Sequence, residues 1–331
     1  MGKQSGKGFP ATPDIAIPYL DDGFNTAQQS NSLKSGGDNE YLISNMKMEH
    51  REKFGYTVFA RPNMCNYLSA YMLGTDVITG TADPYTHTIT RGDRDWLTVE
   101  RQLSSTVYQR LVDCKLENMT ISGEAGQPVK ITVEGEALTA TLRTTGQTLS
   151  YDDSDKTFMF YDGSSRFKID TTNSAMIKGF EVKVNVNSGG GLRDDRFSII
   201  DLPDYNYSVD CTLELYTSNL TRFKKITYNA STVPQADFST GAVEIDCQYV
   251  LTSTRQLKIT VPTLIWESIG GIALNPDGAT MSESIAGPAT KQATTDLMTM
   301  VIMNTANTDG IEDNLDIFIT DNDDKIIIGV Y

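Results

Sequence analysis

The acidic turn Asp321–Asp324 (DNDD) comes nearest to a metal site in this 331-residue sequence. Carboxylate and amide oxygens at close spacing are typical Ca²⁺ ligands, but an EF-hand loop is longer and ends in a bidentate glutamate, which this sequence lacks. A polar turn at the tip of a hairpin explains the four residues more economically. We therefore expect no bound metal.

Residues suited to catalysis form no recognisable local pattern. His50 and His87 have neither a nucleophile nor a carboxylate at a catalytic spacing, and we expect both side chains to be exposed. Gly189–Gly191 are followed by neither Lys-Ser/Thr nor a helix signal, so no phosphate-binding loop is predicted. Arg91–Asp93 spells RGD, a turn-forming triplet that arises readily by chance. The sequence predicts no catalytic residue and no cofactor, so we expect a protein that is not an enzyme.

The four cysteines are far apart and each lies in or beside an apolar stretch. Their spacing forms no CxxC pair, so neither a zinc site nor a disulfide framework is indicated. We expect all four to be reduced and buried as small apolar side chains. They are Cys65, Cys114, Cys211 and Cys247.

Composition limits the class of protein. The net charge of −15 and the pI near 4.6 argue against a surface that grips nucleic acid through its phosphates. Thr, Ser, Asp and Asn between short β-branched runs predict a mainly β protein. No apolar run is long enough to span a bilayer and the first residues lack the apolar core of a signal peptide, so we expect a soluble protein.

The stretch Leu111–Leu138 predicts a long antiparallel hairpin. Val129, Ile131 and Val133 alternate with polar residues, as in a half-buried strand. On the first strand the apolar parity changes near Asn118, which predicts a bulge there. Two glycines and a proline in Gly123–Pro128 require a turn.

The remaining elements are placed by periodicity and by capping residues. Pro62 and Gly74 are suited to the start and the C-terminal cap of a helix between them. Residues 74–95 are expected to be a long loop, and residues 270–295 a linker or an extended arm. Further expected elements are two strands within Tyr41–Phe59 with a turn near Lys53–Gly55, strands at 96–103, 180–186, 209–215, 243–251 and 257–261, a helix at Ser218–Ile226, and strands at 297–303, 315–320 and 325–331, of which the last two pair.

Two tandem domains are expected between two arms. Residues 1–40 would form a loosely ordered N-terminal arm, 41–145 and 146–270 the two domains, and 271–331 a linker and C-terminal hairpin. Both domains show the order strand, strand, helix, loop, strand, strand. Short identities support a duplication, because the segments 112–114 and 130–133 resemble the segments 245–247 and 258–261.

Several of these pieces, in this order, resemble the major tail tube proteins of long, non-contractile-tailed bacteriophages (siphoviruses). The resemblance covers roughly Tyr41–Ser268. The segments that carry it are the Gly-Tyr strand running through Arg61–Pro62 into a helix that ends at Leu73–Gly74, the strand Leu97–Glu100, the hairpin turn Gly123–Pro128 and the strand Leu257–Leu264.

The resemblance implies a fold and a function. The fold would be mainly β, with two tandem β-sandwich or half-barrel domains of the tail-tube type, each with a short flanking helix. Subunits would join into rings that stack into a hollow tube in the virion, made in the host cytoplasm. A trimeric, pseudo-sixfold ring is favoured, and six chains would be needed if each held one domain.

The resemblance also implies partners. These are further copies of the chain, a tape measure protein, and the tail terminator and initiator proteins, while DNA passes through the lumen without specific binding. An acidic wall would repel phosphate. The hairpin residues Gly123, Glu124, Gly126 and Pro128 are expected in the tube wall, and the loop residues Arg91, Asp93, Arg94 and Asp95 between rings.

A different class stays open. An acidic β-sandwich that binds carbohydrate or protein would have the same composition, but it would be monomeric and would expose aromatic side chains in a cleft. An enzyme on a β scaffold is a third possibility, and it would require a pair of acids converging in a pocket.

Overall fold

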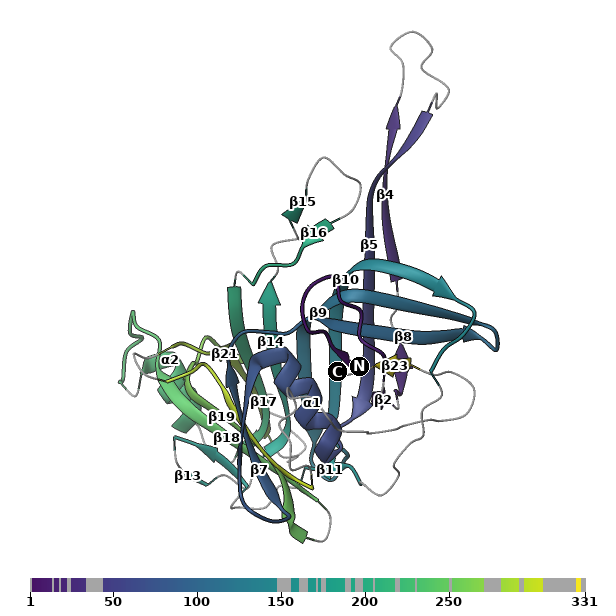
Figure 1. Ribbon diagram of the computed structural model, residues 1–331. Helices are drawn as coiled ribbons and strands as arrows, with labels where there is room; N and C mark the ends of the chain where they lie inside the picture. Colours follow the sequence, from purple (N-terminus) through teal and green to yellow (C-terminus); the bar gives the residue numbers. More distant parts are fainter. Residues whose placement is uncertain are drawn as a thin grey trace.

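A computed structural model gives the architecture of the chain (Figure 1). It describes residues 2–13, 15–17, 19–22, 25–33, 44–147, 156–160, 166–170, 172–173, 177–187, 192–193, 199–204, 206–217, 221–229, 231–249, 252–270, 281–291, 295–305 and 326–328. Within these residues two large antiparallel sheets enclose one hydrophobic core, with two helices.

The larger sheet has thirteen strands in the described residues. Its main path runs β2 (Ile15–Ile17), β23 (Ile326–Ile328), β8 (Leu97–Ser104), β9 (Val107–Glu124), β14 (Ile177–Asn187), β17 (Asn206–Thr217), β21 (Met281–Pro288) and β20 (Ser268–Gly270). On the other side of β9 lie β10 (Lys130–Arg143) and then β5 (Ser44–Phe59), which also pairs with β3 (Asp21–Asp22) and β4 (Asn25–Leu33), while β1 (Gly2–Lys3) pairs with β8.

The smaller sheet has eight strands in the described part of the chain. Its path runs β13 (Thr172–Asn173), β12 (Phe167–Ile169), β18 (Thr240–Tyr249), β19 (Thr252–Ile265), β22 (Thr299–Asn304), β7 (Tyr85–Arg91) and β6 (Gly74–Thr79), and β11 (Phe158–Met159) pairs with β18. A separate ribbon consists of β15 (Leu192–Arg193) and β16 (Ile199–Asp201).

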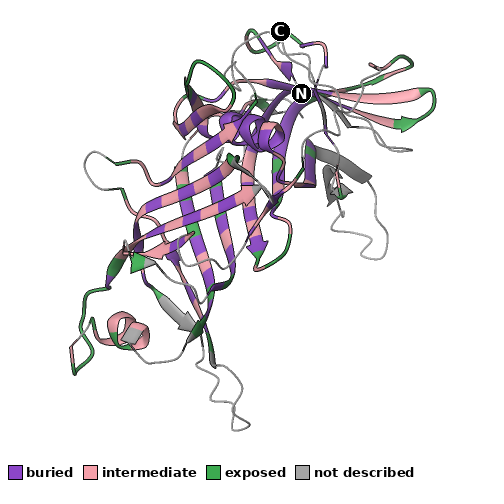
Figure 2. Cartoon of the chain, turned by 90° about the horizontal axis from the view of Figure 1, so that it is seen from below, coloured by how far each residue is buried: buried purple, intermediate pink, exposed green. Residues whose placement is uncertain are grey.

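Alternation along the strands explains how the sheets pack. On β10, Ile131 and Val133 are fully buried while Lys130 and Glu134 are exposed. The same alternation repeats on β9, β14, β17 and β19, so buried and less buried positions form stripes across the sheets (Figure 2). Each sheet therefore turns one apolar face toward the shared core. The predicted mainly β sandwich is confirmed.

Helix α1 (Pro62–Leu73) is inserted into this core. It contacts β6, β7 and β22 of the smaller sheet and β9 of the larger one, and every residue except Asn63 is buried. Pro62 lies in its first turn, and Gly74 ends it with φ = 97°, a left-handed conformation that favours glycine. The predicted helix and both of its boundary residues are confirmed.

Strand β9 changes its neighbour halfway along its length. Its first half pairs with β8 up to Cys114, and its second half pairs with β14 from Asn118 onward, while β10 pairs with both halves. The β9–β10 register shifts because Glu134 faces Asn118 and Gly135 faces Leu116, leaving one extra residue on β9. This shift confirms the bulge predicted near Asn118, and it moves Met119 and Ile121 into the core.

Three expectations about secondary structure were wrong. The stretch Tyr41–Phe59 has no turn near Lys53–Gly55, because β5 runs straight through it in register with β10. The expected loop 74–95 contains the β6–β7 hairpin. Part of the expected linker 270–295 is β21, paired along its length with β17. The predicted second helix is confirmed as α2 (Thr221–Tyr228), which ends two residues beyond its expected end.

The N-terminal residues were expected to be loosely ordered, and their described part is docked on the chain itself. Gly2 and Lys3 pair with Thr98 and Leu97, and the buried Gln4 side chain donates a hydrogen bond to the Thr98 hydroxyl over 2.9 Å. The expected strand 315–320 and the acidic turn 321–324 lie outside the described residues. Ile326–Ile328 pairs with β8 and with β2.

His87 was expected to be exposed, and it is completely buried. Its Nδ1 lies 2.9 Å from Asp76 Oδ2, and Asn66 of α1 donates a hydrogen bond to the same oxygen over 3.1 Å. A polar side chain is stable inside a core when its hydrogen bonds are satisfied. The group thereby ties α1 to β6 and β7. The side chain of His50 lies outside the described ones.

Strands from both expected domains share the two sheets. β9 of the first pairs with β14 of the second, and β7 of the first pairs with β22, which continues to β19. The matched segments 112–114 and 245–247 lie on β9 and β18, in different sheets, so these identities give no support to a duplication. The division into tandem domains stays a prediction.

Candidate functional site

The turn between β9 and β10 is fastened to two other parts of the chain. The Ala125 amide donates a hydrogen bond to the Lys178 carbonyl on β14, and the Gly126 amide donates one to the Phe160 carbonyl, both over 2.8 Å. Pro128 forms a bridge with Met159. The turn therefore joins the β9–β10 hairpin to β14 and to the segment beside β11.

The solvent-facing side of the four central strands is polar, and we call it the polar face. It carries five carboxylates and three lysines, so its charge is negative. Its members are Asn118, Thr120, Ser122 and Glu124 on β9, Lys130, Thr132 and Glu134 on β10, Lys178, Glu181, Lys183 and Asn185 on β14, and Ser208, Asp210, Thr212 and Glu214 on β17.

Neighbouring side chains on the polar face are linked into rows. Asn118 donates a hydrogen bond to Glu134 over 2.9 Å and accepts one from Asn185 over 2.6 Å, which joins three strands. Lys178 pairs with Glu214 over 3.0 Å. Because these bonds run across the strands, they hold the face as one surface.

A cleft of about 570 Å³ opens at the turn end of the polar face. The face is hollowed there because Gly179, paired with Glu124, has no side chain. Three carboxylates and one lysine line the cleft, together with aromatic and small residues. The lining residues are Phe59, Ser122, Gly123, Glu124, Gln127, Pro128, Lys130, Gly179, Phe180, Glu181, Thr212 and Glu214.

The expected wall residues thus lie together at one end of the polar face. Gly123 points inward, where a Cβ atom would lie 2.7 Å from a ring carbon of Phe180, while Gly126 has φ = 79° with open space around it. Glu124 and Pro128 line the cleft. Their role in a wall stays a prediction.

Replacing Gly123 and Gly126 together by valine should destabilise this turn. At Gly123 the added carbons overpack against Phe180, which costs about 1–3 kcal/mol. At Gly126 a β-branched residue is strained at positive φ, at a cost of about 1–3 kcal/mol. Denaturant unfolding measures the loss, and electron microscopy measures assembly. Gly126→Asn is the control, because asparagine tolerates this conformation, and regular rings from the double variant would contradict this account of the hairpin.

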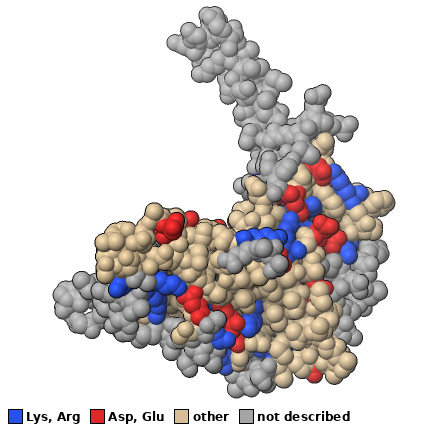
Figure 3. Space-filling model, turned by 90° about the vertical axis from the view of Figure 1, so that its left-hand side faces the viewer, with Lys and Arg blue, Asp and Glu red and all other residues tan. Residues whose placement is uncertain are grey.

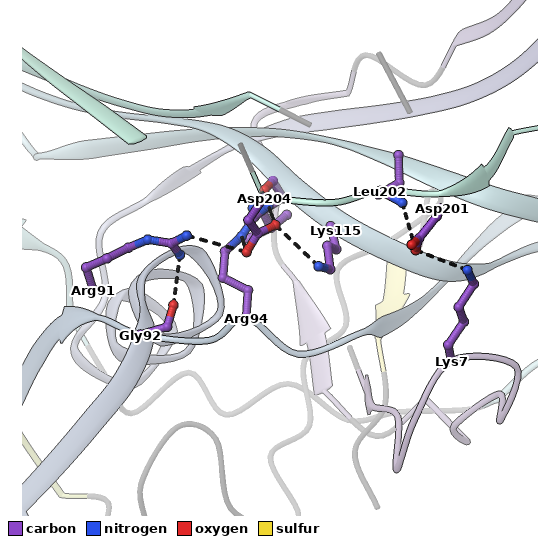
Figure 4. A network of polar contacts seen from close by, with 9 residues as sticks. Lys7, Arg91, Gly92, Arg94, Lys115, Asp201, Leu202 and Asp204 are labelled. Carbon is purple, nitrogen blue, oxygen red and sulfur yellow. Dashed lines mark hydrogen bonds and ion pairs between the residues drawn. The ribbon is translucent and has the colours of Figure 1, made fainter. Parts of the chain in front are cut away.

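A second cluster gathers around Asp204 (Figure 4). Arg94 Nε donates to Asp204 Oδ2 over 3.1 Å, Lys115 Nζ lies 3.3 Å from Oδ1, and Arg91 Nη2 lies 3.5 Å from Oδ2. The Arg94 side chain is 1% exposed and also donates to the Leu116 carbonyl. Three cations from the first half of the chain thus share one carboxylate from the second half.

The electrostatics of Asp204 follow from these partners. Partial burial by itself raises the pKa of its carboxyl, but the hydrogen bond and charge of Arg94 and the charge of Lys115 outweigh burial and lower this pKa to about 2. Asp204 is therefore ionised at any physiological pH, so the carboxylate fastens the segment after β16 to β9 and to the segment before β8.

Apolar and aromatic contacts reinforce the same junction. Leu202 is completely buried against Leu138 and Trp96. The amines of Lys115 and Lys7 lie 4.6 Å and 5.5 Å from the Trp96 ring centroid, and Lys7 also pairs with Asp201 over 3.0 Å. Residues 201–204 therefore cross over β9 and β10 and are held there by these contacts.

Two of the four residues expected between rings belong to this junction. Arg91 and Arg94 bind Asp204 within the chain, Asp95 pairs with Lys3 over 3.6 Å, and Asp93 is exposed. Their expected role between rings stays a prediction. Nothing in the sequence near Asp204 indicates its partners, because they lie 89 to 113 positions away.

The described residues give little support for a metal site, a membrane-spanning helix or a reactive cysteine. No three of their His, Cys, Asp and Glu side chains come close enough together to hold a metal ion, and neither described helix has the length and hydropathy that a membrane crossing requires. The four cysteines are buried and free, as predicted, and burial raises the pKa of the Cys65 thiol to about 12. Such a thiol is unreactive at neutral pH.

These features define a mainly β protein whose described residues form two large antiparallel sheets around one core, with one broad polar sheet face. A family model described as phage tail tube protein matches residues 55–296, and the chain belongs to this family. It is therefore a structural protein of the virion tail, from a family that is not an enzyme family. A comparison with curated proteins found no match.

Proposed function

We propose that the chain assembles with copies of itself into rings, and that the rings stack into the hollow tube through which the genome is delivered. The polar face of the larger sheet is the observation that carries this proposal. It is broad, held together by cross-strand hydrogen bonds, and lined by five carboxylates against three lysines. A sheet with one apolar face in the core and one such polar face suits the wall of an aqueous channel.

The charge of the polar face favours passage of DNA over binding. Phosphate binding depends on surfaces rich in Lys and Arg, and an excess of carboxylates repels phosphate. The mixture of lysines with the carboxylates keeps that repulsion moderate. DNA would then slide through the lumen without specific contacts.

Sheet edges supply the means of ring closure. In the described residues the main path of the larger sheet ends at β2 and β20, and open edges present unpaired backbone groups. Pairing between the edges of neighbouring copies repeats head to tail and closes a ring when the rotation fits. The wall would then be one continuous sheet.

Three chains per ring are favoured over six. β5, α1, β6 and β7 follow the same order as β17, α2, β18 and β19, and in both series the first strand lies in the larger sheet and the hairpin in the smaller one. That shared order supports a duplicated unit, with 41–145 and 146–270 as its two copies. A ring of three chains would then present six similar units.

Parts that project from the sandwich suit contacts between rings. The two-stranded ribbon β4–β5 extends far beyond the sheets in Figure 1, and such a ribbon is marginally stable alone in water. We propose that it packs on a neighbouring ring, with residues 75–95 and 270–295 as further contacts. A tape measure protein inside the tube and terminator and initiator proteins at its ends complete the proposed partners.

Negative-stain electron microscopy of the purified protein tests the proposal. Over a range of concentration and ionic strength we expect rings or hollow tubes, because edge pairing should be concentration-dependent. The mass of an isolated ring distinguishes three chains of 36.5 kDa from six. Monomers under every condition, also after addition of the tail initiator complex, would contradict tube assembly.

One observation favours a second candidate, a binding module for carbohydrate or protein. The cleft at the turn end of the polar face combines Phe59 with three carboxylates, a combination that suits a sugar ring. Binding in a glycan screen by a protein that stays monomeric would support this alternative.

A further inference from the structure

We propose that α2 and the loop after it, residues 221–239, form a contact surface for a second copy of this chain within the ring. We call this segment the α2 patch. The inference rests on the proposed ring assembly and adds a residue-level interface to it.

The α2 patch exposes several large apolar side chains close together in sequence. Val233 is 59% exposed and Phe238 60% exposed, while Phe223 and Tyr228 on the helix are half-buried. The rings of Phe223 and Tyr228 pack edge to face with their centroids 6.0 Å apart. Exposed aromatic side chains are enriched at protein interfaces.

Helix α1 is almost completely buried, whereas α2, which has the same place in the order of elements, is not. α1 and α2 occupy the same place in the two series of elements, each after a strand of the larger sheet and before a hairpin of the smaller one. Eleven of the residues of α1 are buried, between sheets that cover it from two sides. In contrast, described residues of α2 are half-buried or exposed, and the helix contacts β20.

The position of the α2 patch in the fold indicates which molecule binds it. β20 ends the main path of the larger sheet, so α2 lies where the edge of a neighbouring copy arrives if rings close by edge pairing. A second copy is therefore the partner that this place in the fold fits. Figure 3, which views this side of the molecule, shows basic and acidic side chains intermingled and no single-sign field. Such a surface accepts another copy without strong repulsion.

Two ion pairs fix the position of α2, the helical part of the α2 patch. Arg222 Nη1 lies 2.8 Å from Glu283 Oε1, and the Glu283 side chain is fully buried on β21. Lys225 pairs with Asp170, which also accepts a hydrogen bond from the Ala242 amide over 3.1 Å. A helix held in place before association loses less entropy when it docks.

Charged substitutions test the surface. Val233→Asp and Phe238→Asp each place a carboxylate on an exposed loop, so the monomer should keep its thermal midpoint, while the ring fraction should fall by roughly tenfold or more. The matched control is Leu142→Asp, since Leu142 is 70% exposed on β10, lies outside the proposed contact segments and should leave ring formation unchanged. Ring fraction is measured by sedimentation and electron microscopy.

Hydrogen exchange of the wild-type protein gives an independent measurement. Amides of residues 221–239 should exchange more slowly in rings than in monomers. Wild-type rings without this protection, or rings formed normally by both loop variants, would overturn the contact surface and leave tube assembly standing. A wild-type chain that forms no ring at all would overturn the assembly itself, and the contact surface with it.

Discussion

Gly135→Ala should destabilise the monomer by about 3 kcal/mol, because the bulge in the β9–β10 hairpin leaves no room for a side chain there. A Cβ atom on Gly135 would lie 2.5 Å from the Lys115 carbonyl oxygen and against the ring of Phe54. Phe54 is 1% exposed, so its ring has no free space into which to move. Relief would require a backbone shift of β9 or β10.

The matched control is Gly55→Ala on the neighbouring strand β5. Gly55 pairs with Glu134, one residue from the bulge, and its added Cβ would lie 3.2 Å from the Val133 carbonyl oxygen and 3.4 Å from Glu134 Cγ. A shift of a few tenths of an ångström accommodates it, so we expect a loss below about 1 kcal/mol. Chemical denaturation, followed by tryptophan fluorescence, measures both variants. Equal losses at the two positions would contradict the steric argument.

The Gly135 variant should also assemble poorly. The bulge sets the point where β9 exchanges β8 for β14 as its neighbour, so a shifted backbone misplaces β14 and β17 together. Those strands form half of the polar face. We therefore expect fewer rings per folded monomer than for Gly55→Ala when both are compared at the same folded fraction.

Helix α1 and the bulge in β9 could be predicted because neighbouring residues in the sequence determine them. Pro62 and Gly74 bound α1 because a proline suits a first turn and a glycine adopts positive φ at a C-terminal cap. The change of parity from Cys114 to Met119 located the bulge, because a strand keeps one face buried only by inserting a residue. These predictions depended on geometry that neighbouring residues determine.

Elements fixed by distant partners could not be predicted in this way. Strand β21 contains Ser, Glu, Ala and Gly around Ile285, so its composition resembles a linker, and its pairing with β17 makes it a strand. Strand β7 carries His87 at a fully buried position, where apolar residues are expected. Asp76, eleven positions earlier, pairs with that histidine only after the β6–β7 hairpin has formed.

Asp204 and its partners lie farther apart in the sequence than the residues paired in these two cases. Asp204 stands in the short irregular segment between β16 and β17, and its three cations come from β7, from the segment before β8 and from β9. From the sequence, Arg91 and Arg94 were expected in a long loop that joins neighbouring rings. Folding brings them to one carboxylate because the residues 201–204 cross over β9 and β10.

Asp204→Asn should destabilise the monomer by about 3 kcal/mol at pH 7, since it leaves the buried Arg94 without its counter-ion. The Arg94 side chain is 1% exposed, so water cannot replace the lost charge. The control is Asp201→Asn, which removes a pair with Lys7 whose side chains are 38% and 41% exposed and which should cost no more than about 1 kcal/mol. Denaturant unfolding at pH 7 distinguishes the two, and similar losses would show that the cluster contributes little.

The pH dependence of the free energy of unfolding tests the role of the Asp204 charge independently. Asp204 has a pKa of about 2 in the folded chain and near 3.8 when unfolded, so its stabilisation is fully present above pH 4 and is lost as the pH falls toward 2. The shift corresponds to about 2 kcal/mol. Subtracting the unfolding free energy of Asp204→Asn from that of the wild type cancels the other carboxylates, which both chains share. This difference should shrink between pH 4 and pH 2, whereas a difference that stays constant over that interval would mean that Asp204 is held by something other than its charge.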